Sequence, residues 1–328
     1  MNPVNAALRS MAVAALAVAA LTTHAAHAQD AYPNRPIRFV VPFTPGAGTD
    51  RTARVLAPKL SAILGQPIVV ENRGGASGAI GTEIVARAEP DGYTWVLGHD
   101  PAFTINQHLR KMPYDPLKDF APVSLIATVP LVLVASPASG LDSVQALVDK
   151  ARQSPDKLTM ASSGNGTSGH LAAEVFMATT GTKLYHVPYK GQAEAVTDVL
   201  AGRADLNFSA IANVLSLAQA GRLKVLGIGA PKRFADLPGV PTIAELGYPG
   251  FDVSAWHGLL MPAGTPPTIV RRVSDAVSEV LKMPDVAAAF ASQGVDPVGG
   301  PPERLGQLLQ SDSQRWAEVI REAGIKTE

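Results

Sequence analysis

The 328-residue sequence contains no cysteine, and its 28 basic residues balance its 28 acidic ones. The lack of cysteine excludes disulfides, thiol nucleophiles, iron–sulfur clusters and cysteine zinc sites. A near-neutral chain without basic runs also lacks the charge pattern that binds nucleic acid or an anionic membrane. No histidines have a metal-ligand spacing such as HExxH. We therefore expect no metal, no cofactor and no nucleic-acid partner, and a fold that depends on apolar burial alone.

The N-terminus has the pattern of a cleavable signal peptide. Arg9 is the only charge in the first 29 residues, and the apolar run over residues 11–21 is shorter than the ~20 residues of a membrane span. Ala26-His27-Ala28 supplies a small-x-small cleavage pattern, so we place the cut after Ala28. The alternative is an ordinary alanine-rich helix, but such a helix normally has a polar face. We expect export to the periplasm and a mature chain of about two domains.

The mature chain alternates strand-like and helix-like segments. Short apolar runs bounded by glycine and proline predict strands, and apolar residues at helical spacing predict helices between them. This alternation favours an α/β fold with parallel sheets and helices on both faces. The predicted strands are 37–41, 68–70, 94–97, 131–135, 158–161, 183–187, 205–208, 224–228 and 256–261; the predicted helices are 50–64, 80–88, 143–153, 170–179 and 193–200, followed by a mainly helical C-terminal third.

Two glycine-rich turns, at residues 42–50 and 162–170, each join a predicted strand to a predicted helix. Glycine lets the backbone approach a ligand, and a helix N-terminus offers unpaired N–H groups with a partial positive charge. Because neither turn contains lysine, such a site suits a carboxylate better than a multiply charged phosphate. The alternative is that the glycines only permit tight turns and that Thr49 or Asp50 caps a helix. Hydroxyl and amide groups come from Thr44, Thr49, Ser163, Asn165, Thr167 and Ser168.

Enzymatic interpretations of the second turn are weaker. Gly164, Gly166 and Gly169 match a dinucleotide fingerprint, but the acidic residue that should follow is missing from residues 184–190. A serine hydrolase would use Ser163 or Ser168 with His170, yet no third group that orients the histidine can be named. The other mature histidines are expected to be structural. The exception is His99, which with Asp100 ends a predicted strand where a ligand is often bound.

A series of motifs along the mature chain resembles one known family, the substrate-binding proteins of tripartite tricarboxylate transporters, also called the Bug family. No single motif decides the resemblance, but the series runs in order over essentially the whole mature chain. It includes Val41-Pro42-Phe43-x-Pro45-Gly46-x-Gly48-Thr49-Asp50, Val70-Glu71-Asn72-Arg73, Pro90-Asp91-Gly92-Tyr93, Pro113-Tyr114-Asp115-Pro116, Ser163-Gly164-Asn165-Gly166-Thr167, Val187-Pro188-Tyr189-Lys190-Gly191 and Leu237-Pro238-Gly239-Val240-Pro241-Thr242.

The resemblance implies a two-lobed, type II-like periplasmic binding protein. Each lobe would be a mixed, mostly parallel sheet flanked by helices, with the ligand cleft between the lobes. We expect lobe 1 to comprise residues 29–129 and 254–328, and lobe 2 residues 130–253. The ligand-binding residues carried over by position are Phe43, Thr44, Gly46, Ala47, Gly48, Thr49 and Asp50 in the first turn, Ser163, Gly164, Asn165, Gly166 and Thr167 in the second, and His99, Asp100, Asp205, Phe208 and Ser209 elsewhere.

The resemblance further implies a monomeric receptor that delivers a small carboxylate to integral membrane transporter subunits, with no catalytic activity. The ligand would be a mono- or dicarboxylate, aromatic acids and amino acids included, because Asp50, Asp100 and Asp205 disfavour a highly charged anion. Thr44, Ala47 and residues 73–77 depart from the usual family pattern, which leaves the ligand's identity open. A sensor subunit that feeds a membrane kinase is an alternative role for the same fold.

Overall fold

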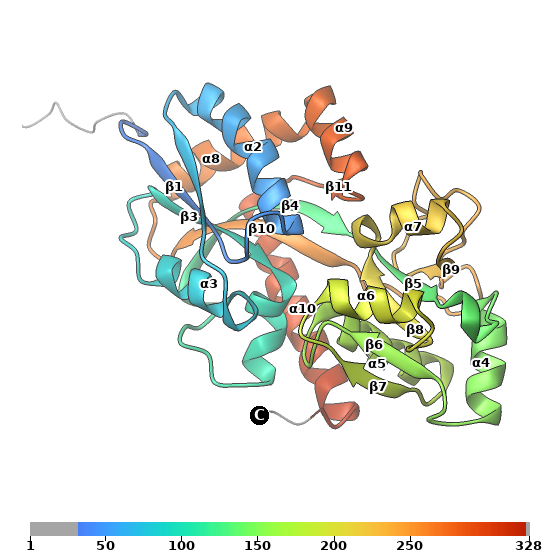
Figure 1. The fold of residues 1–328 in the computed structure, drawn as a ribbon. Coiled ribbons are helices and arrows are strands. Elements are labelled where there is room, and N and C mark those ends of the chain that lie inside the picture. The colour runs from blue at the N-terminus through green and yellow to red at the C-terminus, as the bar shows by residue number, and fades with distance from the viewer. Residues whose placement is uncertain (1–31, 326–328) are drawn as a thin grey trace, which may run out of the picture.

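A computed structural model describes residues 32–325 as two mixed β-sheets flanked by helices (Figure 1). The predicted signal peptide and its cut after Ala28 lie outside the described residues. None of the helices within residues 32–325 combines the length and the apolar character needed to cross a bilayer. The two-lobed α/β architecture predicted from the sequence is confirmed.

The first sheet has six strands in the order β11-β4-β10-β3-β1-β2. Strand β1 pairs in parallel with both β2 and β3, whereas β10 runs antiparallel to β3 and β4, and β11 runs antiparallel to β4. The carboxyl ends of β1 and β3 therefore share one edge of the sheet. The bounds are β1 Ile37–Val41, β2 Ile68–Asn72, β3 Thr94–His99, β4 Phe120–Val129, β10 Ala255–Pro262 and β11 Asp296–Pro297.

The second sheet has five strands in the order β7-β6-β8-β5-β9. Strand β6 pairs in parallel with β7 and β8, and β5 pairs antiparallel with β8 and β9. The carboxyl ends of β6, β7 and β8 thus meet at one edge. The bounds are β5 Leu131–Ala135, β6 Thr159–Ser162, β7 Tyr185–Pro188, β8 Leu206–Ala210 and β9 Lys224–Ile228.

Helices cover both faces of each sheet because successive strand residues point to opposite sides. In the first sheet, Phe39 packs with α2, α8 and α9, while its neighbour Val40 packs with α3 and α10. In the second sheet, Leu133 packs with α4 and α5, and Val132 packs with α6. The bounds are α2 Gly48–Leu64, α3 Ala79–Ala86, α4 Val144–Gln153, α5 Ser168–Thr180, α6 Gln192–Leu200, α7 Leu215–Gln219, α8 Pro267–Leu281, α9 Pro284–Ser292 and α10 Pro302–Glu322, with short turns η2 Ala76–Gly78, η3 Pro101–Ile105, η4 Asn106–His108, η5 Pro137–Ser139 and η6 Ile211–Asn213.

The chain crosses between the two sheets at three places. It passes from β4 directly into β5 through Pro130, and it returns before β10. The long C-terminal helix α10 packs on the first sheet and also contacts α5 of the second (Figure 1). One apolar cluster therefore joins the segments that pack on the first sheet to helix α5 of the second. It is built from Ile105, Leu109, Leu171, Trp316 and Ile320.

Two strands of the first sheet, β4 and the short β11, were not predicted, and the expected share of parallel pairing was wrong. Strand β4 was not predicted, because its sequence FAPVSLIATV contains Pro122 and Ser124, which are rare inside central strands. The sheets are mixed as expected, but they are not mostly parallel. The strands that cross between the sheets, β4, β5 and β10, all run antiparallel to their neighbours. Alternation of strands and helices along the sequence does not reveal such crossings.

Candidate functional site

The first glycine-rich turn follows β1 and leads into α2, as predicted. Gly46 has a φ of 84°, a left-handed conformation that favours glycine. Its N–H donates to Asp50 Oδ2 at 2.8 Å, and Asn72 Nδ2 donates to Asp50 Oδ1 at 2.9 Å and to the carbonyl of Phe43 at 3.1 Å. Arg54 Nε also donates to Asp50 at 2.9 Å. The carboxylate of Asp50 is thus fully used in holding the turn, whereas Thr44 and Gly48 are exposed.

The environment of Asp50 keeps this carboxylate ionised. Burial alone would raise its pKa, but hydrogen bonds from Arg54, Gly46 and Asn72 together hold the pKa below its usual value. An ionised carboxylate with these partners is a structural acceptor. The structure therefore places Asp50 beneath the turn, where it shapes the backbone.

The N-terminus of α2 has no side-chain cap. Its N-cap residue is Ala47, so the N–H groups of the first helical turn have no partner from a capping side chain. Thr49 lies in that turn with only 5% of its surface exposed, and its Oγ1 has no hydrogen-bond partner among the described residues. A buried hydroxyl without a protein partner is rare, and a bound water, ion or ligand group is a common reason for one. Thr49 and the free N–H groups together form a candidate anion site.

The second turn follows β6 and leads into α5. Gly164 and Gly166 have φ values of 120° and 71°, and Thr167 Oγ1 donates to the carbonyl of Gly164 at 2.8 Å. Helix α5 also lacks a side-chain cap. The N–H of Gly166 donates to His170 Nδ1 at 3.1 Å, so this nitrogen carries no proton and Nε2 does. His170 Nε2 lies 3.4 Å from Glu174 Oε1.

A serine–histidine contact missed by the sequence analysis also supports this turn. His186 of β7 stacks on His170 with a centroid distance of 3.9 Å, and its Nε2 lies 2.6 Å from Ser162 Oγ. Burial, and secondarily the neighbouring His170, lowers the pKa of His186 to about 4. Ser162 is completely buried and also bonds the backbone N–H of Gly164 at 3.1 Å. The pair fixes the backbone of the turn, and neither Ser163 nor Ser168 bonds His170.

The end of β3 contacts the first turn through the imidazole ring of His99. His99 packs against Phe43 with ring centroids 4.4 Å apart. Burial, and secondarily His257, lowers the pKa of His99 to about 3, so the ring is neutral. Its Nε2 is buried without a partner, and a Cβ added to Gly78 would lie only 2.5 Å from that atom. His99 is thus a second unpartnered polar group beside the first turn.

The end of β3 also contacts the second turn. Asp100 is 3% exposed, and Ser168 Oγ, at the first residue of α5, donates to Asp100 Oδ2 at 2.8 Å. Burial raises the pKa of Asp100 to about 8, with a smaller contribution from Asp312. A side chain at Gly166 would overlap Leu109, which belongs to the first half of the structure. Residues 99 and 100 therefore connect the two turns.

The last three predicted residues lie in strand β8 or directly before it, in three different environments. Asp205 accepts hydrogen bonds from the N–H and the hydroxyl of Thr159 at 2.8 Å, where β6 begins, so it lies at the opposite end of the strands from the second turn. Phe208 is completely buried in the core with Phe176. Ser209 lies near the carboxyl end of β8, where Gln192 Nε2 donates to its Oγ at 2.9 Å. Of the three, only Ser209 shares an edge with the second turn.

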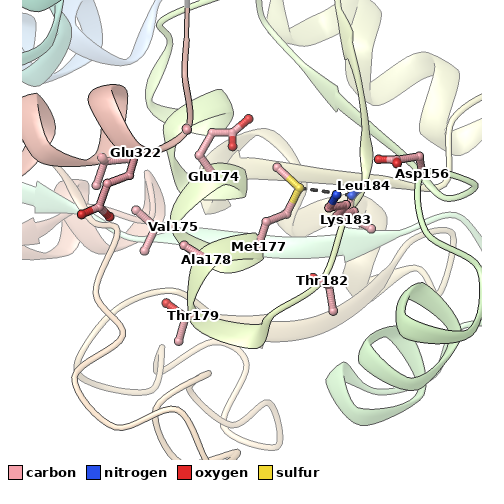
Figure 2. A pocket seen from close by; sticks show the side chains of 12 residues that line it. Asp156, Glu174, Val175, Met177, Ala178, Thr179, Thr182, Lys183, Leu184 and Glu322 are labelled. Carbon is pink, nitrogen blue, oxygen red and sulfur yellow. Dashed lines mark hydrogen bonds between the residues drawn. The ribbon is translucent and has the colours of Figure 1, made fainter.

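A surface groove of about 550 Å³ lies elsewhere, between α5 and the end of α10 (Figure 2). Its walls include Glu174, Met177 and Lys183 on one side and Glu322 on the other. Within the described chain, none of the four buried side-chain polar atoms without a partner lines this groove. Two such atoms lie in or beside the first turn, Thr49 Oγ1 at the start of α2 and His99 Nε2 at the end of β3, so the two turns are the stronger candidate site.

Comparison with known proteins agrees with this geometry. A family model described as the tripartite tricarboxylate transporter family receptor matches residues 52–325. Protein BugT of Bordetella pertussis is 40% identical over 320 residues, which cover 97% of this chain and 98% of the relative. The alignment with BugT thus extends over both turns and both sheets.

Two solved structures are similar over nearly the same length. Rpa4515 of R. palustris, solved with adipate, is 36% identical with a TM-score of 0.82, covering 90% of this chain and 100% of that one. MatC from Rhodopseudomonas palustris, with bound malate, is 33% identical with a TM-score of 0.77, covering 88% and 100%. Both similarities extend across the two sheets, so the arrangement of the lobes is shared.

Proposed function

Because the chain belongs to the family of tripartite tricarboxylate transporter receptors, we propose that it captures a small organic carboxylate between its two lobes. The observation that supports this proposal best is the buried, unpartnered hydroxyl of Thr49 at the uncapped N-terminus of α2. A carboxylate oxygen at that position would accept from Thr49 and from the free N–H groups of the helix. The bound acid would then complete the hydrogen bonds that the protein leaves open.

We propose that the two turns act together. The first turn, with Phe43, Thr44, Gly46, Ala47, Gly48 and Thr49, would hold one end of the ligand. The second turn, residues 163–167, would hold the other end with the N–H groups at the start of α5. Asp50, Asp100 and Asp205 then have structural roles, since the partners of Asp50 and Asp205 occupy their carboxylates and Asp100 is buried against Ser168.

The lobes are proposed to divide at residues 129–130 and 253–254. The two sheets lie on either side of these positions, where the chain passes from β4 to β5 and returns before β10. Lobe 1 then comprises residues 29–129 and 254–328, and lobe 2 comprises residues 130–253. Few crossing strands between two rigid sheets favour hinge closure around a ligand.

A dicarboxylate is the proposed ligand class. The similar proteins Rpa4515 and MatC were solved with adipate and malate. In this chain neither turn contains lysine, and the only arginine at their helix starts, Arg51, donates to the carbonyl of Gly46 at 2.8 Å. Recognition by N–H groups and hydroxyls suits one carboxylate at each turn better than three charges at one of them.

The same proposal extends to the export of the chain, its oligomeric state and its partners. The chain would be cut after Ala28, act as a monomer in the periplasm and deliver its ligand to integral membrane transporter subunits. A hydrolase activity is not proposed, because Ser162, the serine that contacts a histidine beside the second turn, is completely buried and hydrogen-bonded to the backbone of Gly164.

A thermal-shift screen of residues 29–328 against mono-, di- and tricarboxylates, amino acids and aromatic acids tests this function. A ligand at 100 times its Kd stabilises the folded state by about 2.7 kcal/mol, which raises Tm measurably. We expect the largest rise with dicarboxylates. A folded, ligand-free sample that responds to no carboxylate would refute the proposal.

A further inference from the structure

A short hydrogen-bond relay lies beside the second turn, at the carboxyl ends of β6 and β8. Gln192 is the first residue of α6, and its Nε2 donates to Asn207 Oδ1 at 2.7 Å and to Ser209 Oγ at 2.9 Å. Asn207 Nδ2 in turn donates to the carbonyl of Ala161 at 2.7 Å. Asn207 and Ser209 point to the same side of β8, opposite to Phe208.

The relay adjoins the second turn through the loop that precedes α6. The N–H of Tyr189 donates to the carbonyl of Ser162 at 2.9 Å. A Cβ added to Gly164 would lie 3.3 Å from the carbonyl oxygen of Tyr189. Gln192 therefore begins its helix at the same sheet edge as the second turn.

The backbone fixes the direction of every bond in this relay. The carbonyl of Ala161 can only accept, so the amide nitrogen of Asn207 must face it and Asn207 Oδ1 must face Gln192. Because Asn207 Oδ1 is an acceptor, the atom of Gln192 that faces it must be the amide nitrogen. The two protons of that nitrogen are then used in the hydrogen bonds to Asn207 and Ser209. Flipping either amide would place two acceptors or two donors against each other.

Within this amide, Gln192 Oε1 is the polar atom that makes no hydrogen bond in the relay. Among residues 32–325 no donor bonds it, and it is not one of the buried side-chain atoms without a partner, so Oε1 is accessible. The neighbouring Asn207 and Ser209 are uncharged and are both already paired. At the sheet edge that carries the second turn, Gln192 thus presents an acceptor oxygen that is fixed in one orientation.

We propose that Gln192 is a specificity-determining residue that selects carboxylates bearing a hydroxyl or amino group, which donates to its Oε1. This inference rests on the proposed function, because it assigns a feature of the ligand held at the second turn. An unsubstituted acid would displace water from Oε1 without replacing the hydrogen bond. A site built to bond a substrate OH or NH discriminates against the analogue that lacks it.

Calorimetric titrations with matched acids test the proposal. The probes are succinate, malate and aspartate, then glutarate, 2-hydroxyglutarate and glutamate, and adipate, 2-hydroxyadipate and 2-aminoadipate. At the chain length that binds, we expect the hydroxy or amino acid to bind about tenfold or more tightly than the plain acid. The Gln192→Met variant, similar in shape but without the amide, should reduce that preference to about threefold or less while binding of the plain acid changes little.

Two further variants separate specificity from folding. Gln145→Met makes the same change at an exposed position of helix α4, where Gln145 Nε2 donates to Asp149, and should leave every Kd unchanged. Gln192→Glu keeps acceptor oxygens but adds a charge, and should favour the amino acid of a set over its hydroxy acid. If no carboxylate binds the wild-type chain, the proposed function fails. If carboxylates bind with no preference, or Gln192→Met keeps the preference, only the role of Gln192 is refuted.

Discussion

Ser168 donates a hydrogen bond of 2.8 Å to Asp100, and this contact joins the end of β3 in the first sheet to the start of α5 beside the second. Asp100 is 3% exposed and has no salt-bridge partner among the described residues. Asp312 of α10 adds a further acidic group, and the nearby His99 and His257 are held neutral by burial. A buried carboxyl in such surroundings is most stable when it keeps its proton.

The first prediction concerns the pH dependence of stability. The pKa of Asp100 is about 8 in the folded chain and about 4 in an unfolded one. The folded state therefore binds this proton more tightly, and its contribution to stability is full below about pH 4 and is lost as pH rises through about 8. Asp100→Asn, which cannot ionise and still offers Ser168 an acceptor, should lose less Tm than wild type between pH 6 and pH 9.

The control for this prediction is Asp149→Asn, which removes an exposed carboxylate from α4. Its Tm profile should run parallel to that of wild type over the same range. Parallel profiles for Asp100→Asn and wild type would show that Asp100 ionises normally in the folded protein.

The second prediction separates binding from stability at Thr49. Since its buried hydroxyl has no partner within residues 32–325, Thr49→Val should leave Tm unchanged or raise it slightly. The same change should weaken carboxylate binding about tenfold, because the ligand loses a hydrogen bond. On the same helix, Thr52→Val removes a hydroxyl that lies 3.1 Å from His257 Nδ1, and it should lower Tm. Equal losses of Tm in the two variants would contradict the assignment.

The third prediction tests the contact between Leu109 and the second turn. Gly166→Ala places a methyl group against Leu109 and also forces a φ of 71° on a non-glycine residue. We expect a loss of about 1–3 kcal/mol in the free energy of unfolding. Gly46→Ala has a similar φ of 84° but open space around it. It should therefore lose only about 1 kcal/mol of unfolding free energy, which is the cost of the left-handed backbone conformation.

A double-mutant cycle with Leu109→Ala isolates the steric part of this loss. The added methyl group should be less harmful once Leu109 is shortened, so the two changes should compensate in part. Strictly additive losses would mean that the turn and Leu109 do not touch in solution.

The sequence was informative wherever the signal is local. Both turns could be predicted because an apolar run, a cluster of glycines and a helical period follow one another within 30 residues. Pairings over long distances could not be predicted. Asp205 was assigned to the ligand, yet Thr159, 46 residues away, occupies its carboxylate. The relay from Gln192 to Ala161 and the contact of Ser162 with His186 were missed for the same reason.

The most direct test is a crystal structure of residues 29–328 with the tightest-binding carboxylate of the screen. We predict a carboxylate oxygen at hydrogen-bond distance, about 3 Å, from Thr49 Oγ1 and the first N–H groups of α2, and the rest of the ligand against the second turn. A ligand bound instead in the groove between α5 and α10, or touching neither turn, would contradict the account.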